Sequence, residues 1–234
     1  MKTIVCSREE AIRAAAQKAL SLIEGKPEAV LALSAGEDEL ELYRALVRLS
    51  AERGISLSGL RLFAACELEG LEKDAPQSVY ARLKTCFVEE GGASEARLFA
   101  PDGADCASYD RALAEAGGVD LAILGLGVNA RVAFNEPATQ YDTYTHVQKL
   151  TKTTRASLSP AFGAGEELPE RGVTLGFQNL CAAREILVIA LGEEKRRAVF
   201  HMLYGRDDSI YPAAFLQLPL HVSLFADESA AADL

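Results

Sequence analysis

The chain has 234 residues, 49% of them apolar and 25% charged, which is typical of a globular protein long enough to bury a full core as one domain. Its formal net charge of −10 argues against a nucleic-acid partner and against an anionic membrane surface, because both require a basic face. The chain has no apolar run near the roughly 18 residues of a membrane span, its start acquires charges too early for a signal peptide, and its five scattered cysteines form no CxxC pair, so we expect a cytoplasmic protein with reduced thiols and no metal site.

The first part of the chain alternates between amphipathic and apolar segments. Ser7 and Glu10 form a capping box that predicts a helix ending near Gly25. Residues 28–34 (EAVLALS) have the composition of a buried strand. A second helix is expected from Asp38 onward, with its leucines on one stripe.

The same alternation continues to the end of the chain. The further predicted strands are residues 61–65, 95–100, 120–125, 185–191 and 221–226, and the further predicted helices are residues 77–88, 107–117 and 193–204. This order predicts a single α/β domain over residues 1–234, a Rossmann-like, mostly parallel sheet with helices on both faces. The longest irregular stretch, about residues 129–170, is where such a fold would place its site, beyond the carboxyl ends of the strands.

Two loops that directly follow predicted strands carry acids. The loop at residues 34–38 precedes a helix N-terminus, which suits an anion, but Glu37 and Asp38 would satisfy the helix dipole themselves and repel phosphate. An acidic helix cap is therefore the preferred interpretation. In the loop at residues 66–70, Cys66 is expected to be a small buried hydrophobe, and Glu67 or Glu69 is either a general base or, as we prefer, a solvated carboxylate.

The third loop, residues 125–137 (GLGVNARVAFNEP), has glycines that permit a tight turn and ends in an aromatic, an amide and an acid packed before a proline. The segment LGLGVNARVAFNEP resembles the signature of the glucosamine-6-phosphate deaminase/isomerase family. Five more blocks resemble that family in the same order along the chain: LEKDAPQSVYARL, LTKTTR, GVTLGFQNL, LGEEKRRAV and PAAFLQL. The related 6-phosphogluconolactonases share the fold but not the FNEP motif, so they rank second.

The resemblance implies a Rossmann-like fold and a reaction on aminosugar phosphates without metal or organic cofactor. Members of the family open the sugar ring, isomerise aldose to ketose and release ammonia. That chemistry needs a carboxylate that moves a proton, a histidine that assists ring opening and a cationic cradle for phosphate. The implied partner is a small-molecule sugar phosphate or related anion, and a homo-oligomer is possible.

Four positions keep the residue types that the resemblance implies. Glu136 matches the FNEP glutamate that supports the ring-opening histidine, and Asn129 matches a position that is Asp or Asn in the family. Arg155 matches the arginine of the LTxxTR block, and Lys195 matches the lysine that contacts the substrate phosphate. These residues are therefore candidates for catalysis and substrate binding.

Three parts of the implied site depart from the family. Arg131 replaces the ring-opening histidine, and an arginine cannot exchange protons near neutral pH. Cys66 replaces the catalytic aspartate, so the proton shuttle is lost unless Glu67 or the Cys66 thiolate takes over. Gly36 remains in the phosphate loop and Gly127 in the glycine-rich turn, both as candidate binding residues, but carboxylates replace the hydroxyls that follow Gly36.

Two interpretations of Arg131 follow from its surroundings in the sequence. In the preferred one, its guanidinium pairs with Glu37, Asp38 or Glu136 and fills the site. In the other, it binds a carboxylate or phosphate from a new direction.

Three functions are consistent with the residues. The first is a divergent sugar-phosphate isomerase or deaminase-like enzyme, whose ordinary deaminase activity the substitutions make doubtful. The second is a catalytically silent binding or regulatory module on the same fold. The third, a hydrolase similar to 6-phosphogluconolactonase, is disfavoured because that chemistry also relies on the missing histidine and phosphate loop.

Overall fold

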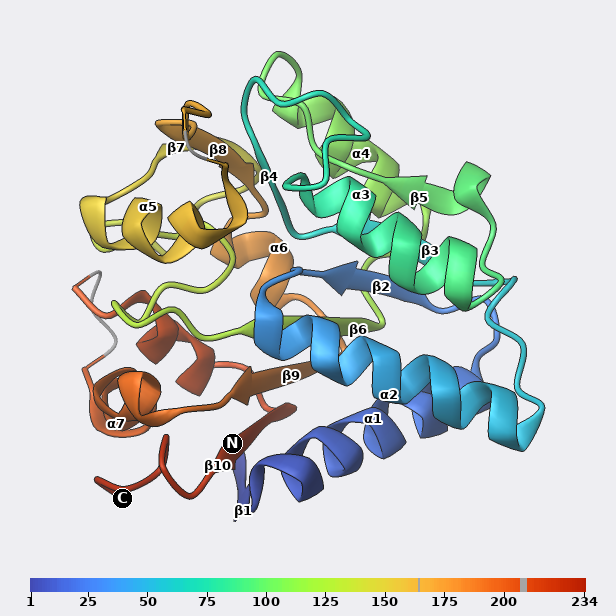
Figure 1. Ribbon diagram of the computed structural model, residues 1–234, viewed down its shortest axis with the longest axis horizontal. Coiled ribbons are helices and arrows are strands. Elements are labelled where there is room, and N and C mark those ends of the chain that lie inside the picture. Colours follow the sequence, from blue (N-terminus) through green and yellow to red (C-terminus); the bar gives the residue numbers. More distant parts are fainter. Residues whose placement is uncertain (164, 207–209) are drawn as a thin grey trace.

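The computed structural model describes residues 1–163, 165–206 and 210–234, so residue 164 of the predicted irregular stretch lies outside the described residues. A seven-stranded sheet in the order β1-β10-β9-β6-β2-β3-β5 forms its centre, and all neighbouring strands in it are parallel (Figure 1). Its strands are β1 (Lys2–Cys6), β2 (Val30–Leu33), β3 (Arg61–Ala64), β5 (Leu98–Phe99), β6 (Leu121–Gly125), β9 (Glu185–Ala190) and β10 (Val222–Asp227). The expected parallel sheet is confirmed, with an edge strand, β1, that the sequence analysis did not predict.

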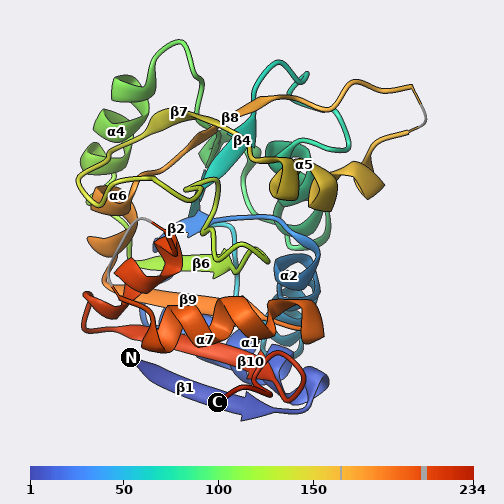
Figure 2. The ribbon, with the colours of Figure 1, turned by 90° about the vertical axis from the view of Figure 1, so that its left-hand side faces the viewer.

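Helices cover both faces of this sheet, as expected. Figure 1 shows α1 (Arg8–Gly25), α2 (Glu37–Arg53) and α3 (Val79–Leu83) in front of it, and Figure 2 shows α4 (Cys106–Glu115) and α6 (Phe177–Cys181) on the opposite side of the sheet, to the left in that view. The remaining helices, α5 (Lys152–Leu158) and α7 (Arg196–Tyr204), lie at the edge toward which β2 and β9 point (Figure 1). Shorter 3₁₀ turns occur at Glu95–Arg97, Ser159–Ala161, Glu193–Lys195 and Pro212–Gln217.

Local sequence signals explain why helix α1 and strand β6 form where they were predicted. The capping box is present at the start of α1, where the Glu10 N–H donates to Ser7 Oγ and the Ser7 N–H donates to the Glu10 carboxylate. In β6 the four residues from Leu121 to Leu124 are buried, because the strand lies in the middle of a sheet that is covered on both faces. No helix in the described ranges is long and apolar enough to cross a membrane.

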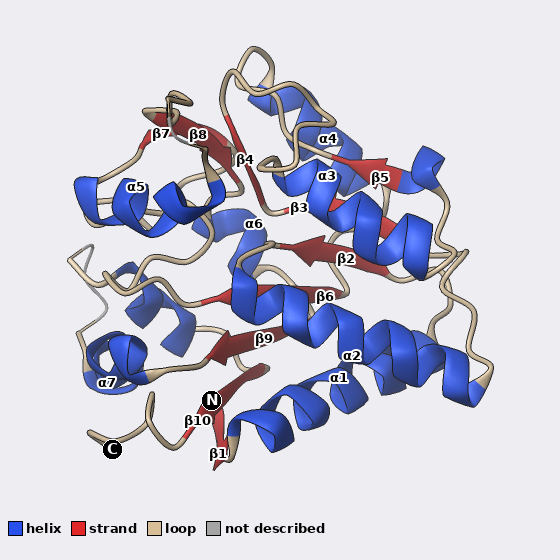
Figure 3. Cartoon of the chain, in the orientation of Figure 1, coloured by secondary structure: helices blue, strands red, loops and turns tan. Residues whose placement is uncertain are grey.

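A second, three-stranded sheet was not predicted. It has the order β4-β8-β7 and is antiparallel, and Figure 3 shows it apart from the main sheet. Its strands are β4 (Cys66–Leu68), β7 (His146–Lys149) and β8 (Arg171–Thr174). Residues 66–70 and 129–170 are expected to be irregular from the sequence, because strands of three or four residues without an apolar run give almost no local signal.

The predicted helix at residues 77–88 differs in kind from the one observed. It begins as α3 and continues as a π-helix, η1 (Lys84–Glu90), whose wider turns the apolar pattern does not distinguish from an α-helix. The predicted strand at residues 95–100 is mostly a 3₁₀ turn, and only Leu98–Phe99 pair with β3.

Candidate functional site

A cavity of about 780 Å³ lies at the carboxyl edge of the main sheet. The loop after β2 and the first turn of α2 form one wall, and residues 125–128 after β6 form another part of the lining. The segment around η3 (Ser159–Ala161) and Lys195 after β9 complete it. This is the position that a parallel α/β fold offers to a ligand.

The N-terminus of α2 is acidic, as expected. Gly36 is the N-cap and makes no side-chain hydrogen bond, and the first turn carries Glu37, Asp38 and Glu39. Gly36 and the three acids all line the cavity. The backbone N–H groups and the helix dipole therefore already face carboxylates, which oppose the binding of a phosphate at this point.

Two of these acids are held in fixed positions. The Leu191 N–H donates to Asp38 Oδ2 at 3.1 Å, and burial raises the pKa of Asp38 to about 6, although the nearby Lys195 acts in the opposite direction. Glu39 is only 5% exposed, and Ser34 Oγ donates to its Oε1 at 2.7 Å. The glycine at 125 is necessary here, because a Cβ at that position would clash with the Glu39 carboxylate.

Arg131 lines the cavity but does not form the ion pair that we preferred. Its Nη1 donates to the Ala133 carbonyl, and its guanidinium carbon lies 5.5 Å from the centre of the Phe134 ring. No carboxylate of the described residues lies within ion-pair distance of it. The expected pairing with Glu37, Asp38 or Glu136 is therefore wrong, because the local turn supplies a carbonyl and an aromatic face instead.

The turn that carries Arg131 has an unusual backbone. Ala130 has φ 61° and Ala133 has φ 50°, values that L-residues with a side chain seldom adopt. The side chain of Arg131 packs directly against the backbone of Gly127, where a Cβ would clash with Arg131 Cγ. The arginine is thus fixed by its own turn and by a glycine rather than by an acidic partner.

Cys66 lines the cavity as a buried thiol, as the first interpretation expected. Burial raises the pKa of this thiol well above its ordinary value, and the charge of Arg131 offsets this only in part. The thiol therefore stays protonated at neutral pH. The alternative, that its thiolate replaces the family's aspartate as proton shuttle, does not fit this environment.

Glu67 is neither a solvated carboxylate nor a group facing the cavity. Its two carboxylate oxygens accept hydrogen bonds of 2.8–2.9 Å from the N–H groups of Leu68, Val79 and Tyr80, which places it as a cap at the start of α3. Burial raises its pKa. Its neighbour Glu69 pairs with Arg171 at 2.6 Å, so both glutamates that we considered as bases are engaged elsewhere.

Glu136 and Asn129 form a closed network outside the cavity lining. Glu136 is 1% exposed, and Asn129 Nδ2 donates to its Oε2 at 2.7 Å. The backbone N–H and Oγ1 of Thr151 donate to the same carboxylate at 3.2 and 3.1 Å. Because its oxygens have three protein donors, Glu136 stabilises the turn and the start of α5.

The two predicted cations occupy different places. Lys195 lines the cavity and donates from Nζ to the Leu126 carbonyl at 2.7 Å. Arg155 is not part of the lining: its Nη2 donates to the Leu168 carbonyl at 3.2 Å, and it lies 3.9 Å from Glu170. The cavity lining therefore brings together Gly36, Gly127, Cys66, Arg131 and Lys195. The lining does not include Glu67, Asn129, Glu136 and Arg155, although Asn129 Oδ1 accepts a hydrogen bond from the Arg131 N–H at 3.3 Å.

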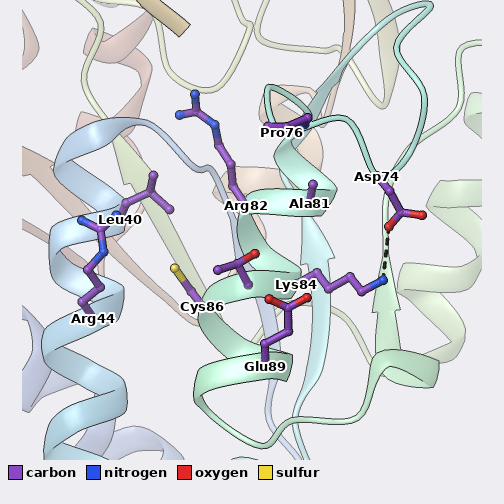
Figure 4. A pocket seen from close by; sticks show the side chains of 10 residues that line it. Leu40, Arg44, Asp74, Pro76, Ala81, Arg82, Lys84, Cys86 and Glu89 are labelled. Carbon is purple, nitrogen blue, oxygen red and sulfur yellow. Dashed lines mark hydrogen bonds and ion pairs between the residues drawn. The ribbon is translucent and has the colours of Figure 1, made fainter.

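Arg82 of α3 is a cavity residue that the sequence analysis missed. Its Nη1 donates to the Ala35 carbonyl at 3.2 Å and to Glu37 at 3.1 Å. The same residue also lines a second groove of about 510 Å³ between α2 and η1, where Figure 4 shows Lys84 bound to Asp74 and Arg82 extending away from them. A contact that spans 45 residues of sequence leaves no local pattern by which to predict it.

The chemistry open to this cavity follows from its lining. It carries four carboxylates (Glu37, Asp38, Glu39 and Glu194) and three cations (Arg82, Arg131 and Lys195). In the described part of the chain no histidine lines the cavity, and no group of three or more His, Cys, Asp or Glu residues is placed to hold a metal ion. The arrangement suits a polar ligand with hydrogen-bonding groups and charge.

Comparisons with known proteins agree with this fold. Residues 7–223 match the family described as glucosamine-6-phosphate isomerases/6-phosphogluconolactonase. A glucosamine-6-phosphate deaminase of Cutibacterium acnes is 34% identical, with 100% of this chain and 92% of the relative covered, and one of Mycolicibacterium smegmatis is 35% identical, with 93% and 86% covered.

Solved structures give the same result. A monomeric glucosamine-6-phosphate deaminase has a TM-score of 0.95 at 30% identity, with 99% of both chains covered. A 6-phosphogluconolactonase of Trypanosoma brucei has a TM-score of 0.77 at 20% identity, with 100% of this chain and 98% of the other covered, and shares the fold. With a match over most of its length and relatives above 30% identity, the chain belongs to the family of glucosamine-6-phosphate isomerases and 6-phosphogluconolactonases.

Proposed function

We propose that this chain is a protein of carbohydrate metabolism that binds a sugar phosphate or a related sugar anion in the cavity and lacks the ordinary glucosamine-6-phosphate deaminase reaction. The buried, protonated thiol of Cys66 carries this proposal, because it stands where the resemblance implies the proton-shuttling aspartate. The relatives named as glucosamine-6-phosphate deaminases support the class of ligand.

Proton transfer between two sugar carbons needs a base whose pKa lies near the working pH and whose oxygen or nitrogen reaches the ligand. Cys66 reaches the cavity but holds its proton, and Glu67 is occupied by three backbone donors. Arg131, at the position implied for the ring-opening histidine, stays charged at neutral pH. Each missing proton-transfer group typically removes a factor of about 10² or more from the rate.

The proposal is tested by assaying ammonia release and ketose formation from glucosamine-6-phosphate at neutral pH. One of the deaminases to which this chain is similar serves as the positive control. We expect ammonia release at least about 10²-fold below that control, together with a rise in the unfolding temperature when the sugar phosphate is added. Turnover comparable to the control would refute the proposal. Hydrolysis of 6-phosphogluconolactone above background would instead assign the lactonase activity.

Back-substitution tests whether Cys66 and Arg131 together account for the missing activity. The double variant Cys66→Asp with Arg131→His should release ammonia faster than the wild type, because it returns an ionisable acid and an imidazole to the cavity. Cys106→Asp is the matched control, since Cys106 lies at the start of α4 and outside the cavity lining. If wild type and double variant are equally inactive although both bind the sugar phosphate, the loss does not lie in these two residues.

A further inference from the structure

Two oppositely charged side chains pack against Gly125 and Gly127, the two glycines that we call the cavity floor. The Glu39 carboxylate lies over Gly125 and the Arg131 side chain lies over Gly127, and in both places a Cβ would clash with them. Gly125 ends strand β6, and Gly127 begins the turn that carries Arg131, with its N–H donating to the Arg131 carbonyl. One short stretch of backbone therefore has a negative side chain packed on one glycine and a positive side chain packed on the other.

These charges do not neutralise each other. No ion pair joins Glu39 and Arg131, because each is held by its own local partner: Ser34 Oγ on Glu39 Oε1, and the Ala133 carbonyl on Arg131 Nη1. The second oxygen, Glu39 Oε2, accepts no hydrogen bond from the described residues, although the side chain is more than nine-tenths buried and lines the cavity. This oxygen is not among the buried polar atoms without a partner, so it is accessible from the cavity that Glu39 lines, and a ligand donor there can reach it.

The guanidinium of Arg131 likewise has N–H donors that make no hydrogen bond to the described residues. Among the described residues its one hydrogen-bond acceptor is the Ala133 carbonyl, bound by Nη1, so it retains N–H donors that a planar oxyanion accepts in pairs. The lining as a whole carries one more carboxylate than cations, four against three. A monoanionic carboxylate is therefore repelled less than a phosphate, whose charge at neutral pH is about −1.5 to −2.

We propose that the cavity selects a sugar acid, with the ligand's carboxylate on Arg131 and an amino or hydroxyl group on Glu39. This assignment rests on the proposed function, because it concerns the same cavity, and it narrows the sugar anion to one that carries a carboxylate. Arg131 and Glu39 are then the specificity-determining residues. The phosphate-repelling first turn of α2 faces the donor end of the ligand.

Calorimetric titration of the full-length chain tests the assignment with three probes: 2-amino-2-deoxygluconate, gluconate and glucosamine-6-phosphate. We expect 2-amino-2-deoxygluconate to bind at least tenfold more tightly than glucosamine-6-phosphate. Arg131→Ala should weaken the binding of both sugar acids at least tenfold, whereas Arg111→Ala, a surface arginine on α4, should leave it unchanged. Glu39→Gln should weaken the binding of 2-amino-2-deoxygluconate more than the binding of gluconate, because only 2-amino-2-deoxygluconate carries an ammonium group.

Gly127→Ala provides a variant that keeps every charge. Its Cβ displaces the Arg131 stem, so it should weaken sugar-acid binding in the same way as Arg131→Ala, while circular dichroism reports that the fold is intact. Tighter binding of glucosamine-6-phosphate than of 2-amino-2-deoxygluconate would overturn the assignment, as would unchanged sugar-acid binding by a folded Arg131→Ala variant. Neither result bears on ammonia release, so failure of this assignment is distinguishable from failure of the proposed function.

Discussion

The segment from Arg131 to Glu136 places two charged side chains five residues apart in opposite situations. The carboxylate of Glu136 is buried and accepts hydrogen bonds from Asn129 and from both the backbone and side chain of Thr151. The guanidinium of Arg131 faces the cavity with one carbonyl as its hydrogen-bond acceptor. The comparison teaches that one end of the segment is fixed in the interior by a closed hydrogen-bond network, whereas the other end lines the cavity with a single carbonyl partner.

The sharpest way to break this comparison is to remove the buried carboxylate. Glu136→Ala should lower the free energy of unfolding by about 3 kcal/mol, because it leaves the donors of Asn129 and Thr151 without their acceptor. Urea denaturation measures this effect. Arg131→Ala is the matched control and should change stability by less than about 1 kcal/mol. Equal effects of the two substitutions would mean that the two ends of the segment do not differ as described.

Asp38, in the cavity wall, should make the stability of the chain depend on pH. Its pKa is raised from 3.8 to about 6 in the folded chain, so between these values the folded state binds the proton that the unfolded state releases. The stability supplied by protonated Asp38 is therefore present at low pH and is lost as the pH rises through about 6. Asp38→Asn should remove that loss and raise stability at pH 8 by about 2 kcal/mol.

The measurement is urea unfolding of wild type and variant at pH 4 and pH 8. An asparagine oxygen still accepts the Leu191 N–H, so the comparison isolates the charge. Glu37→Gln, which changes a more exposed carboxylate of the same turn, is the control and should show no comparable pH dependence. An equal effect of Asp38→Asn at both pH values would contradict the raised pKa.

The smallest expected effect concerns the donor that holds Glu39. Ser34→Ala removes the hydroxyl that donates to Glu39 Oε1 and accepts from the Gly125 N–H, and should destabilise the chain by about 1 kcal/mol. Thermal or urea unfolding reports this loss, with the exposed Ser56→Ala as control. If Ser34→Ala is neutral, the position of the Glu39 carboxylate over Gly125 does not depend on this hydroxyl.

Much of the fold is predictable because its signals are local. The capping box of α1 and the apolar run of β6 determine their elements within a few residues. The strand β4 is not predictable in this way, because its three residues pair with β8 more than 100 positions later. The π-helical turns of η1 have the same apolar periodicity as the expected α-helix at short length.

The candidate site is less predictable for the same physical reason. The glycine-rich turn and the acidic first turn of α2 are visible in the sequence, and both line the cavity. The partners of Glu67 are backbone N–H groups at residues 68, 79 and 80, and the partner of Arg131 is a backbone carbonyl, so side-chain charge gave the wrong expectation for both. Backbone groups carry no sequence information about which side chain they will bind.

The two glycines of the cavity floor also impose a constraint on how this sequence can change. Neither glycine has a positive φ, so an alanine at each is opposed by side chains alone: Glu39 at position 125, and Arg131 with Asn129 at position 127. An alanine at 127 therefore displaces Arg131 unless a shorter residue stands at 131, and an alanine at 125 displaces Glu39 unless a shorter residue stands at 39. Each pair behaves as one mutational unit, and homologous chains should show these positions varying jointly.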